Sequence, residues 1–265
     1  MPIVFAAIAP HPPVLIPEIG KENLEKIKQT EAAYKKLEQE FYASKPESLV
    51  VISPHGNILP DSFNINLNAD YEVNFKEFGE YSLELKFKSD FMVIQEIRAA
   101  DETNKTVPII LSSDKHLDHG VGIPLYFLSQ HSKNIPVIPI TTSGLGYKEH
   151  FEFGKFLHRM LSRTNKRFGI LASGDLSHRL TENAPGGFSP EGKKMDKKII
   201  DLIKAKDFEG LMKIDSKLIE AGGECGLRSF LILAGMVESQ NLSPEVLSYE
   251  GPFGVGYLVC NFKVN

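Results

Sequence analysis

Three hydrophobic runs along this chain end in the same way, with a histidine a few residues after the last apolar side chain. The runs are Ile3–Ala9, Leu49–Ser53 and Phe168–Ala172, and the histidines that follow them are His11, His55 and His178. Short apolar runs rich in Val, Ile and Phe predict strands buried on both faces. If the three strands are parallel neighbours, their histidines meet at one carboxyl edge, where open α/β sheets bind ligands.

The residues around the first histidine restrict its backbone. His11 lies between Pro10 and Pro12. A proline disfavours the helical region for the residue before it, so Ala9 and His11 are expected to stay extended. The imidazole should therefore project from the end of a buried strand.

Helical periodicity alternates with further strand-like runs along the rest of the chain. The expected helices are Lys21–Tyr42, Phe91–Ala100, Val121–His131, Lys148–Ser162, Lys193–Lys206 and Leu227–Val237, and the further strands are Val107–Leu111, Pro136–Thr141, Glu245–Tyr249 and Gly254–Phe262. Strands that alternate with helices indicate an α/β fold with helices on both faces of the sheet. We expect one domain over residues 1–265, a three-layer sandwich with a mixed central sheet.

Two segments depart from this pattern. Phe63–Phe78 alternates between apolar and polar residues, which predicts a half-exposed antiparallel strand beyond the parallel core. Ser173–Pro190 is rich in Gly, Pro and Asn and predicts a long loop. Loops of this length inside compact domains are usually functional or disordered, and we expect this one to be a mobile wall over the ligand crevice.

Composition narrows the class of protein. The chain has 265 residues, 42% of them hydrophobic and 24% charged, and a net charge of −4. That charge provides no electrostatic footprint for nucleic acid or an anionic membrane. No apolar run approaches the ~20 residues of a membrane span, and the first residues do not resemble a signal peptide. Two cysteines cannot form a disulfide framework, so a cytoplasmic protein is expected.

Four of the eight histidines are candidates for a functional site. His131, His150 and His158 fall in helical patterns and are expected at the surface or an interface, and His116 lies in a polar loop. The candidates are the remaining four, which follow strands or lie in Gly- and Asp-containing loops: His11, His55, His119 and His178.

A carboxylate in a glycine-rich turn completes a candidate metal site. Glu224 lies in the sequence GGECG, where the glycines permit close backbone approach and the following helix favours a negative charge at its start. Two histidines and one carboxylate form the facial triad of non-haem Fe(II) oxygenases, and zinc accepts the same set. Alternatively, Glu224 only caps the helix. The neighbouring Cys225 could be a nucleophile or a thiolate ligand, but beside an apolar helix a buried, inert thiol is expected.

Five segments together resemble a known family. APHPP, SPHG, LDHGVGIPL, SGDLSH and GGECG occur in this order between His11 and Glu224 and are similar to the class III extradiol ring-cleavage dioxygenases of the LigB type. The resemblance implies that His11, His55 and Glu224 bind Fe(II), that His178 is the acid/base, and that His119 lies near the substrate and dioxygen. It also implies a catechol-like aromatic substrate that is cleaved with O₂.

The resemblance extends to two related groups and leaves alternatives open. Cys225-Gly226-Leu227-Arg228 partly resembles a segment of Memo-like proteins, which need not be ring-cleaving enzymes and carry a cysteine near the carboxylate's position. The form of the motifs is also similar to LigB-like proteins associated with AMMECR1 domains, which implies a functional link to an AMMECR1-like protein. Two alternative functions therefore remain: a metal-binding or signalling protein without ring cleavage, and a zinc-dependent hydrolase on the same fold. A homodimer is also possible.

Overall fold

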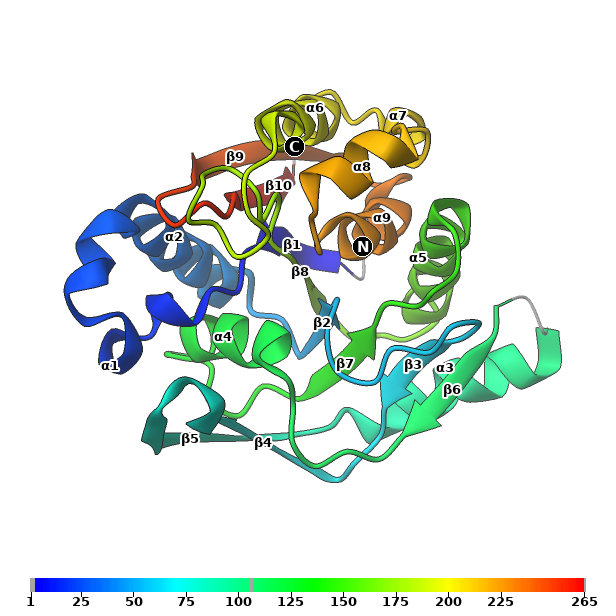
Figure 1. Cartoon of the computed structure of the whole chain (residues 1–265). Coiled ribbons are helices and arrows are strands. Elements are labelled where there is room, and N and C mark those ends of the chain that lie inside the picture. Colours follow the sequence, from blue (N-terminus) through cyan, green and yellow to red (C-terminus); the bar gives the residue numbers. More distant parts are fainter. Residues whose placement is uncertain (1–2, 105–106, 265) are drawn as a thin grey trace.

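The apolar runs lie side by side in one central sheet of the computed structural model, which describes residues 3–104 and 107–264 (Figure 1). Within these residues the sheet has eight strands in the order β6-β3-β7-β2-β8-β1-β10-β9. Their bounds are β1 Ile3–Ala9, β2 Ser48–Ser53, β3 Phe63–Asn66, β6 Ile109–Ser112, β7 Val137–Thr141, β8 Phe168–Ser173, β9 Leu242–Glu250 and β10 Tyr257–Val264. β1 and β2 pair with β8 in parallel, whereas β10 pairs with β1 in antiparallel fashion. The sheet is mixed, as expected.

Helices cover both faces of this sheet, so the predicted three-layer α/β fold is confirmed. One hydrophobic core joins the sheet to α3 (Phe91–Asn104), α5 (Tyr147–Leu161), α6 (Pro190–Lys204) and α9 (Leu227–Val237). A second core joins the other face to α2 (Lys28–Ser44) and α4 (His119–Leu128). The short elements are α1 Pro17–Gly20, α7 Phe208–Met212, α8 Ser216–Gly222 and the 3-10 helices η1 Pro13–Leu15, η2 Lys21–Lys26 and η3 Lys76–Phe78. Among the described residues, no helix is both long enough and apolar enough to traverse a bilayer.

The middle strands are apolar throughout because both of their faces are covered. In β2, Val50 and Ile52 pack into the first core, and Leu49 and Val51 pack into the second. Consecutive side chains of a strand point to opposite faces, so a strand between two helical layers needs apolar residues at every position. This explains the unbroken runs in the sequence.

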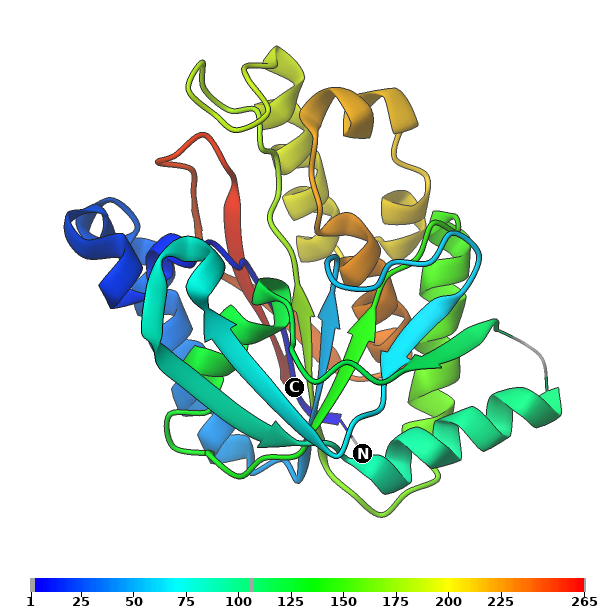
Figure 2. The ribbon, with the colours of Figure 1, turned by 60° about the horizontal axis from the view of Figure 1, so that its bottom comes forward.

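The alternating segment Phe63–Phe78 is divided between two sheets. Its first part, β3, is buried at every position and belongs to the main sheet, so the prediction of a half-exposed strand is wrong there. The polar residues Asn64 and Asn66 are buried because their side-chain oxygens accept hydrogen bonds from the backbone of Ser112 (3.1 Å) and Asp114 (2.9 Å). Its second part, β4 (Asp70–Phe75), pairs antiparallel with β5 (Glu80–Lys88) in a separate hairpin (Figure 2). The antiparallel strand outside the parallel core is therefore confirmed for β4.

His150 is buried, which corrects the expectation that it lies at the surface. The residue is 0% exposed in α5, and its ring packs edge-on against Phe63. Its Nδ1 lies 2.7 Å from the carbonyl oxygen of Gly146, and its Nε2 accepts a hydrogen bond from the backbone of Ser143 (3.2 Å). These two contacts together fix a neutral ring with the proton on Nδ1. Burial lowers the pKa of His150 to about 4.

The pKa of His150 predicts a specific loss of stability in acid. Between pH 6.5 and about 4 the unfolded chain binds a proton at His150 that the folded protein refuses, so the free energy of unfolding falls as the pH is lowered. The loss from this residue approaches about 3 kcal/mol at the acid end. Chemical denaturation of wild type and His150→Gln across this range should give a stability difference that shrinks with acidity. His131→Gln, at an exposed histidine, is the control. A His150→Gln curve parallel to wild type would contradict the assignment.

Candidate metal centre

The three strands that precede the candidate histidines end at one edge of the sheet. β8 lies between β1 and β2 and is parallel to both, with Ala9 aligned to Ser173 and Ile52 aligned to Ala172. The chain therefore leaves all three strands at nearly the same height. His11 and His55 each lie two residues beyond the end of their strand. The predicted gathering of strand exits is confirmed.

His11 is fixed by hydrogen bonds on three sides. Its backbone N–H donates to Asp175 Oδ1 (2.9 Å), its Nδ1 lies 2.8 Å from Ser173 Oγ, and its Nε2 lies 3.0 Å from His55 Nε2. The side chain is almost fully buried. Because Nδ1 is occupied by the serine, Nε2 is the nitrogen that faces the centre of the site.

His55 and His119 are held together by a serine and a helix cap. The backbone N–H of His55 donates to Ser53 Oγ (3.1 Å), and the Ser53 hydroxyl donates to Asp118 Oδ1 (2.6 Å). Asp118 also caps α4 by accepting from the backbone of Val121. His119, the first residue of that helix, therefore lies beside His55 with ring centroids 4.5 Å apart.

Gly120 permits this close packing between α4 and the end of β2. A Cβ atom at position 120 would lie 2.4 Å from Ser53 Oγ and 3.2 Å from His55 Cδ2. A larger residue would therefore push His55 and the helix apart.

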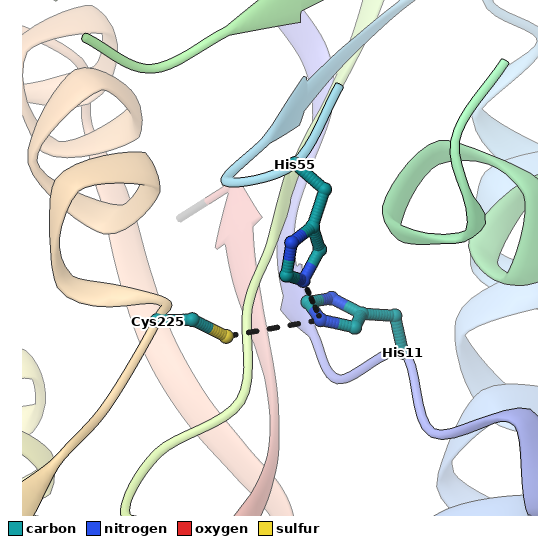
Figure 3. Close-up of side chains that lie close together, drawn as sticks. All are labelled: His11, His55 and Cys225. Atoms are coloured by element: carbon teal, nitrogen blue, oxygen red, sulfur yellow. Dashed lines mark hydrogen bonds between the residues drawn. The ribbon is translucent and has the colours of Figure 1, made fainter. Parts of the chain in front are cut away.

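His11, His55 and Cys225 direct one ligand atom each towards a common point (Figure 3). Cys225 Sγ lies 3.7 Å from His11 Nε2, and one ligand atom from each residue lies within 4.8 Å of the others. A metal bound about 2.1 Å from imidazole nitrogens and about 2.3 Å from a thiolate holds its ligands roughly 3–4 Å apart. The arrangement fits one metal ion without a large movement of the side chains.

The two histidines are also in the protonation state that metal binding needs. Burial and the neighbouring histidines lower the pKa of His11 well below its ordinary value, and burial lowers the pKa of His55. Both rings are therefore neutral near pH 7 and present lone pairs. Burial raises the pKa of the Cys225 thiol, so this residue would release its proton only on binding a metal.

Glu224 lies next to this group but points its carboxylate elsewhere. Its Oε2 accepts a hydrogen bond from the backbone N–H of Leu227 at the start of α9, the capping role that the sequence left open. Burial raises the pKa of its carboxyl. The triad of His11, His55 and Glu224 stays a prediction, while Cys225, expected to be inert, supplies the third ligand atom in this geometry.

His178 is hydrogen-bonded to the Gly222–Gly226 turn that contains Glu224 and Cys225. Its backbone N–H and its ring Nδ1 both lie within hydrogen-bond distance of the Gly223 carbonyl oxygen, at 2.8 and 3.0 Å. A carbonyl can only accept, so Nδ1 carries a proton, and in the neutral ring the lone pair lies on Nε2. Asp175, the residue that sequence reasoning considered as a partner of His178, instead binds the backbone of His11. Burial raises the pKa of the Asp175 carboxyl.

An open cleft lies beside the histidines. It has a volume of about 690 Å³, and His55 and His119 form part of its wall. Polar side chains from the end of β3 and from the segment before α4 dominate the remaining lining, among them Asn64, Asn66 and Asp114. A small molecule in this cleft would reach the face of His55 and His119.

The predicted loop Ser173–Pro190 is confirmed over residues 174–189, whereas Ser173 ends β8 and Pro190 begins α6. The first half of this loop is held by hydrogen bonds. Residues 173–177 are buried, and the backbone of Leu176 and Leu180 donates to Gly256 (2.8 Å) and Gly254 (3.0 Å). The exposed positions lie within residues 181–188. The prediction of a mobile wall therefore applies to that second half.

Sequence reasoning missed three residues, Ser53, Asp118 and Ser173, whose hydrogen bonds position the candidate histidines. Each lies within two residues of a candidate histidine or at the end of a histidine-bearing strand. Asp118 carried a recognisable signal, because an aspartate immediately before a helical pattern is typical of an N-cap.

Comparisons with known proteins place the chain among known sequences and folds. A family model described as the catalytic LigB subunit of aromatic ring-opening dioxygenase matches residues 5–260. Protein CA_C1420 of Clostridium acetobutylicum is 31% identical over 264 residues, which cover 97% of this chain and 56% of that protein. The chain thus spans little more than half the length of this relative.

Two further proteins are similar over different extents. The 2,3-dihydroxyphenylpropionate/2,3-dihydroxicinnamic acid 1,2-dioxygenase of Klebsiella pneumoniae is 33% identical over 81 residues, which cover 29% of this chain and 26% of that enzyme. The crystal structure of the uncharacterized protein JW3007 from Escherichia coli K12 superposes with a TM-score of 0.69 at 14% identity. It covers 98% of this chain and 99% of its own, and shows a shared fold.

Metal analysis of single variants tests this centre. His11→Ala and His55→Ala should each lose the bound metal when elemental content is measured after dialysis. The third ligand is decided by a pair of variants, since the geometry predicts metal loss in Cys225→Ser and retention in Glu224→Gln. Cys260→Ala, at the other free cysteine, is the matched control and should retain metal. Loss in Glu224→Gln with retention in Cys225→Ser would instead assign the carboxylate as the ligand.

Proposed function

The chain belongs to the LigB family, the catalytic subunits of aromatic ring-opening dioxygenases, and on that basis we propose that it is an Fe(II)-dependent extradiol dioxygenase. Its substrate would be a catechol-like aromatic, opened with O₂ beside the diol to give a ring-opened semialdehyde. The observation that carries this proposal is the convergence of His11 and His55 next to an open cleft.

The chain itself would supply the metal ligands and the wall of the cleft. His11, His55 and a side chain of the Gly222–Gly226 turn would hold the ion. A bound divalent metal supplies Lewis acidity, which favours loss of the catechol protons, and keeps both reactants close together. The cleft would orient the ring so that its two hydroxyl groups face His55 and His119.

His178 is suited to carry a proton during this reaction. Its Nδ1–H is engaged with Gly223, which leaves the lone pair of Nε2 free to accept a proton from a catechol hydroxyl and return it later. His178 does not belong to the group of three ligand residues. His119, packed against His55, would contact the substrate or dioxygen from the cleft side.

A second function is favoured by one observation, the sulfur ligand. A site with two imidazoles and a thiolate suits softer ions such as Zn²⁺ or Cu(I) better than the set with a carboxylate does. Under this alternative the protein is a Memo-like metal-binding protein without ring-cleavage activity.

Anaerobic reconstitution distinguishes these functions. Protein loaded with Fe(II), Zn²⁺ or Cu(I) is mixed with a panel of catechols and air-saturated buffer, and O₂ consumption and the yellow ring-fission product are followed. The dioxygenase predicts both signals with Fe(II) alone. Iron-loaded wild-type protein that binds catechols but opens none of them would favour the binding protein.

His178→Ala should separate catalysis from metal binding. We expect this variant to retain its iron and bind catechol, while the ring-opening rate falls by ~10²–10⁴, the usual effect of a positioned acid/base. His119→Ala should also retain iron, with a smaller loss of rate or weaker substrate binding. Exposed His131→Ala should behave as wild type. Loss of iron from His178→Ala would identify this histidine as a ligand.

A further inference from the structure

Strand β5 has one edge that no other strand covers. It pairs with β4 in a two-stranded sheet, and among the described residues no further strand joins it. β5 is nine residues long and contains no proline, and its ladder with β4 is regular over residues 84–88 and shifts register before them. Exposed edges present unpaired backbone N–H and C=O groups, and folded proteins normally shorten them, bulge them or cover them with another chain.

A groove runs along this free edge. It has a volume of about 410 Å³, and five consecutive residues, Leu83–Phe87, form one wall. Consecutive residues of a strand point to opposite faces, so a wall made of all five follows the strand's edge rather than one face. Tyr126, Gln130 and Lys133, from the end of α4 and the segment after it, form the opposite wall. The free edge of β5 therefore faces a groove and not a packed neighbour.

The side chains of β5 follow a pattern that is complementary to itself. Leu83, Leu85 and Phe87 pack towards the protein core, and Glu84 and Lys86 lie on the opposite, solvent-facing side. The side chains of Glu84 and Lys86 are 46% and 71% exposed, and within one chain they form a surface ion pair of 3.2 Å that a second copy can replace with pairs between chains. One acidic and one basic residue therefore flank Leu85 symmetrically.

We infer that the free edge of β5 pairs antiparallel with β5 of a second copy of this chain, about a two-fold axis at Leu85. This register places Glu84 of each copy opposite Lys86 of the other and Leu83 opposite Phe87. A symmetric interface makes every contact twice, so two cross-strand ion pairs form. The two hairpins become one four-stranded sheet, and both exposed edges are covered.

Other registers fit less well. An axis at Glu84 or at Lys86 would place like charges directly opposite each other, which is destabilising. A shift by one residue would put charged side chains on the apolar face. An axis at Leu83 would place Lys86 opposite Glu80, but the Glu80 carboxylate already accepts hydrogen bonds from the backbone of Ser82 and Leu83. The axis at Leu85 pairs the two charges nearest to it, Glu84 and Lys86, with opposite charges of the second copy.

Charge reversal on β5 tests the dimer and its register. Sedimentation velocity over a range of concentrations should show a wild-type dimer. Glu84→Lys places two lysines opposite each other, as Lys86→Glu does with two glutamates, so each should weaken dimerisation by roughly tenfold or more. An equimolar mixture of the two variants should dimerise again, because each chain then faces the opposite charge. The double variant Glu84→Lys/Lys86→Glu should also dimerise.

The controls separate a specific contact from an effect of net charge. Glu209→Lys makes the same change of charge on α7, which lies far from β5 in both views (Figures 1 and 2), and should dimerise as wild type. Circular dichroism should show that all variants fold. A wild-type protein that stays monomeric at every concentration would overturn the inference. So would a dimer that charge reversal leaves unchanged, or single variants that fail to dimerise when mixed.

Discussion

The parallel pairing of β1 and β2 with the shared neighbour β8 is the constraint on which the candidate site depends. The backbone ladder aligns the ends of three strands that are far apart in the sequence, and the residues just beyond those ends meet at one edge. The apolar side chains on both faces of the strands fix this register, because a shift by one residue would exchange the contents of the two cores. The hydrophobic cores therefore set the position of the candidate metal ligands as well as the stability of the fold.

Hydrogen bonds from buried polar groups fix the position of His11 at the end of β1. Ser173 occupies one nitrogen of His11, Asp175 holds its backbone, and the Tyr34 hydroxyl donates to the Pro10 carbonyl just before it. Burial raises the pKa of the Asp175 carboxyl, and the hydrogen bond from His11 partly offsets the cost of burying it. Buried carboxyl groups with shifted pKa values concentrate where proteins position reactive side chains.

The sequence predicted the fold well because buried strands and helices need apolar residues at regular positions, and this pattern can be recognised in the sequence. The long apolar runs identified the strands, and Leu227–Val237 matched a helix at both ends. The local sequence pattern gave wrong predictions where contacts with a distant part of the backbone determine whether a side chain is buried. Asn64 and Asn66 resembled the solvent-facing side of a strand, but their side chains accept hydrogen bonds from the end of β6 and from the segment that follows it. Glu224 and Cys225 are neighbours in one turn, and which of them faces the histidines depends on backbone torsions, such as the left-handed Gly223, that composition does not report.

The wide separation of the converging residues along the chain has a consequence for how the protein matures in the cell. His11 and Cys225 are 214 positions apart, and the contact between them exists only once β1, β8 and the turn before α9 have all joined the same edge. A ribosome would have synthesised most of the polypeptide before the third donor atom emerged. At this candidate site, capture of a metal by all three residues would therefore be a late step in biosynthesis, after the sheet has formed. Nascent or truncated chains would expose the two early histidines without the ability to retain the ion.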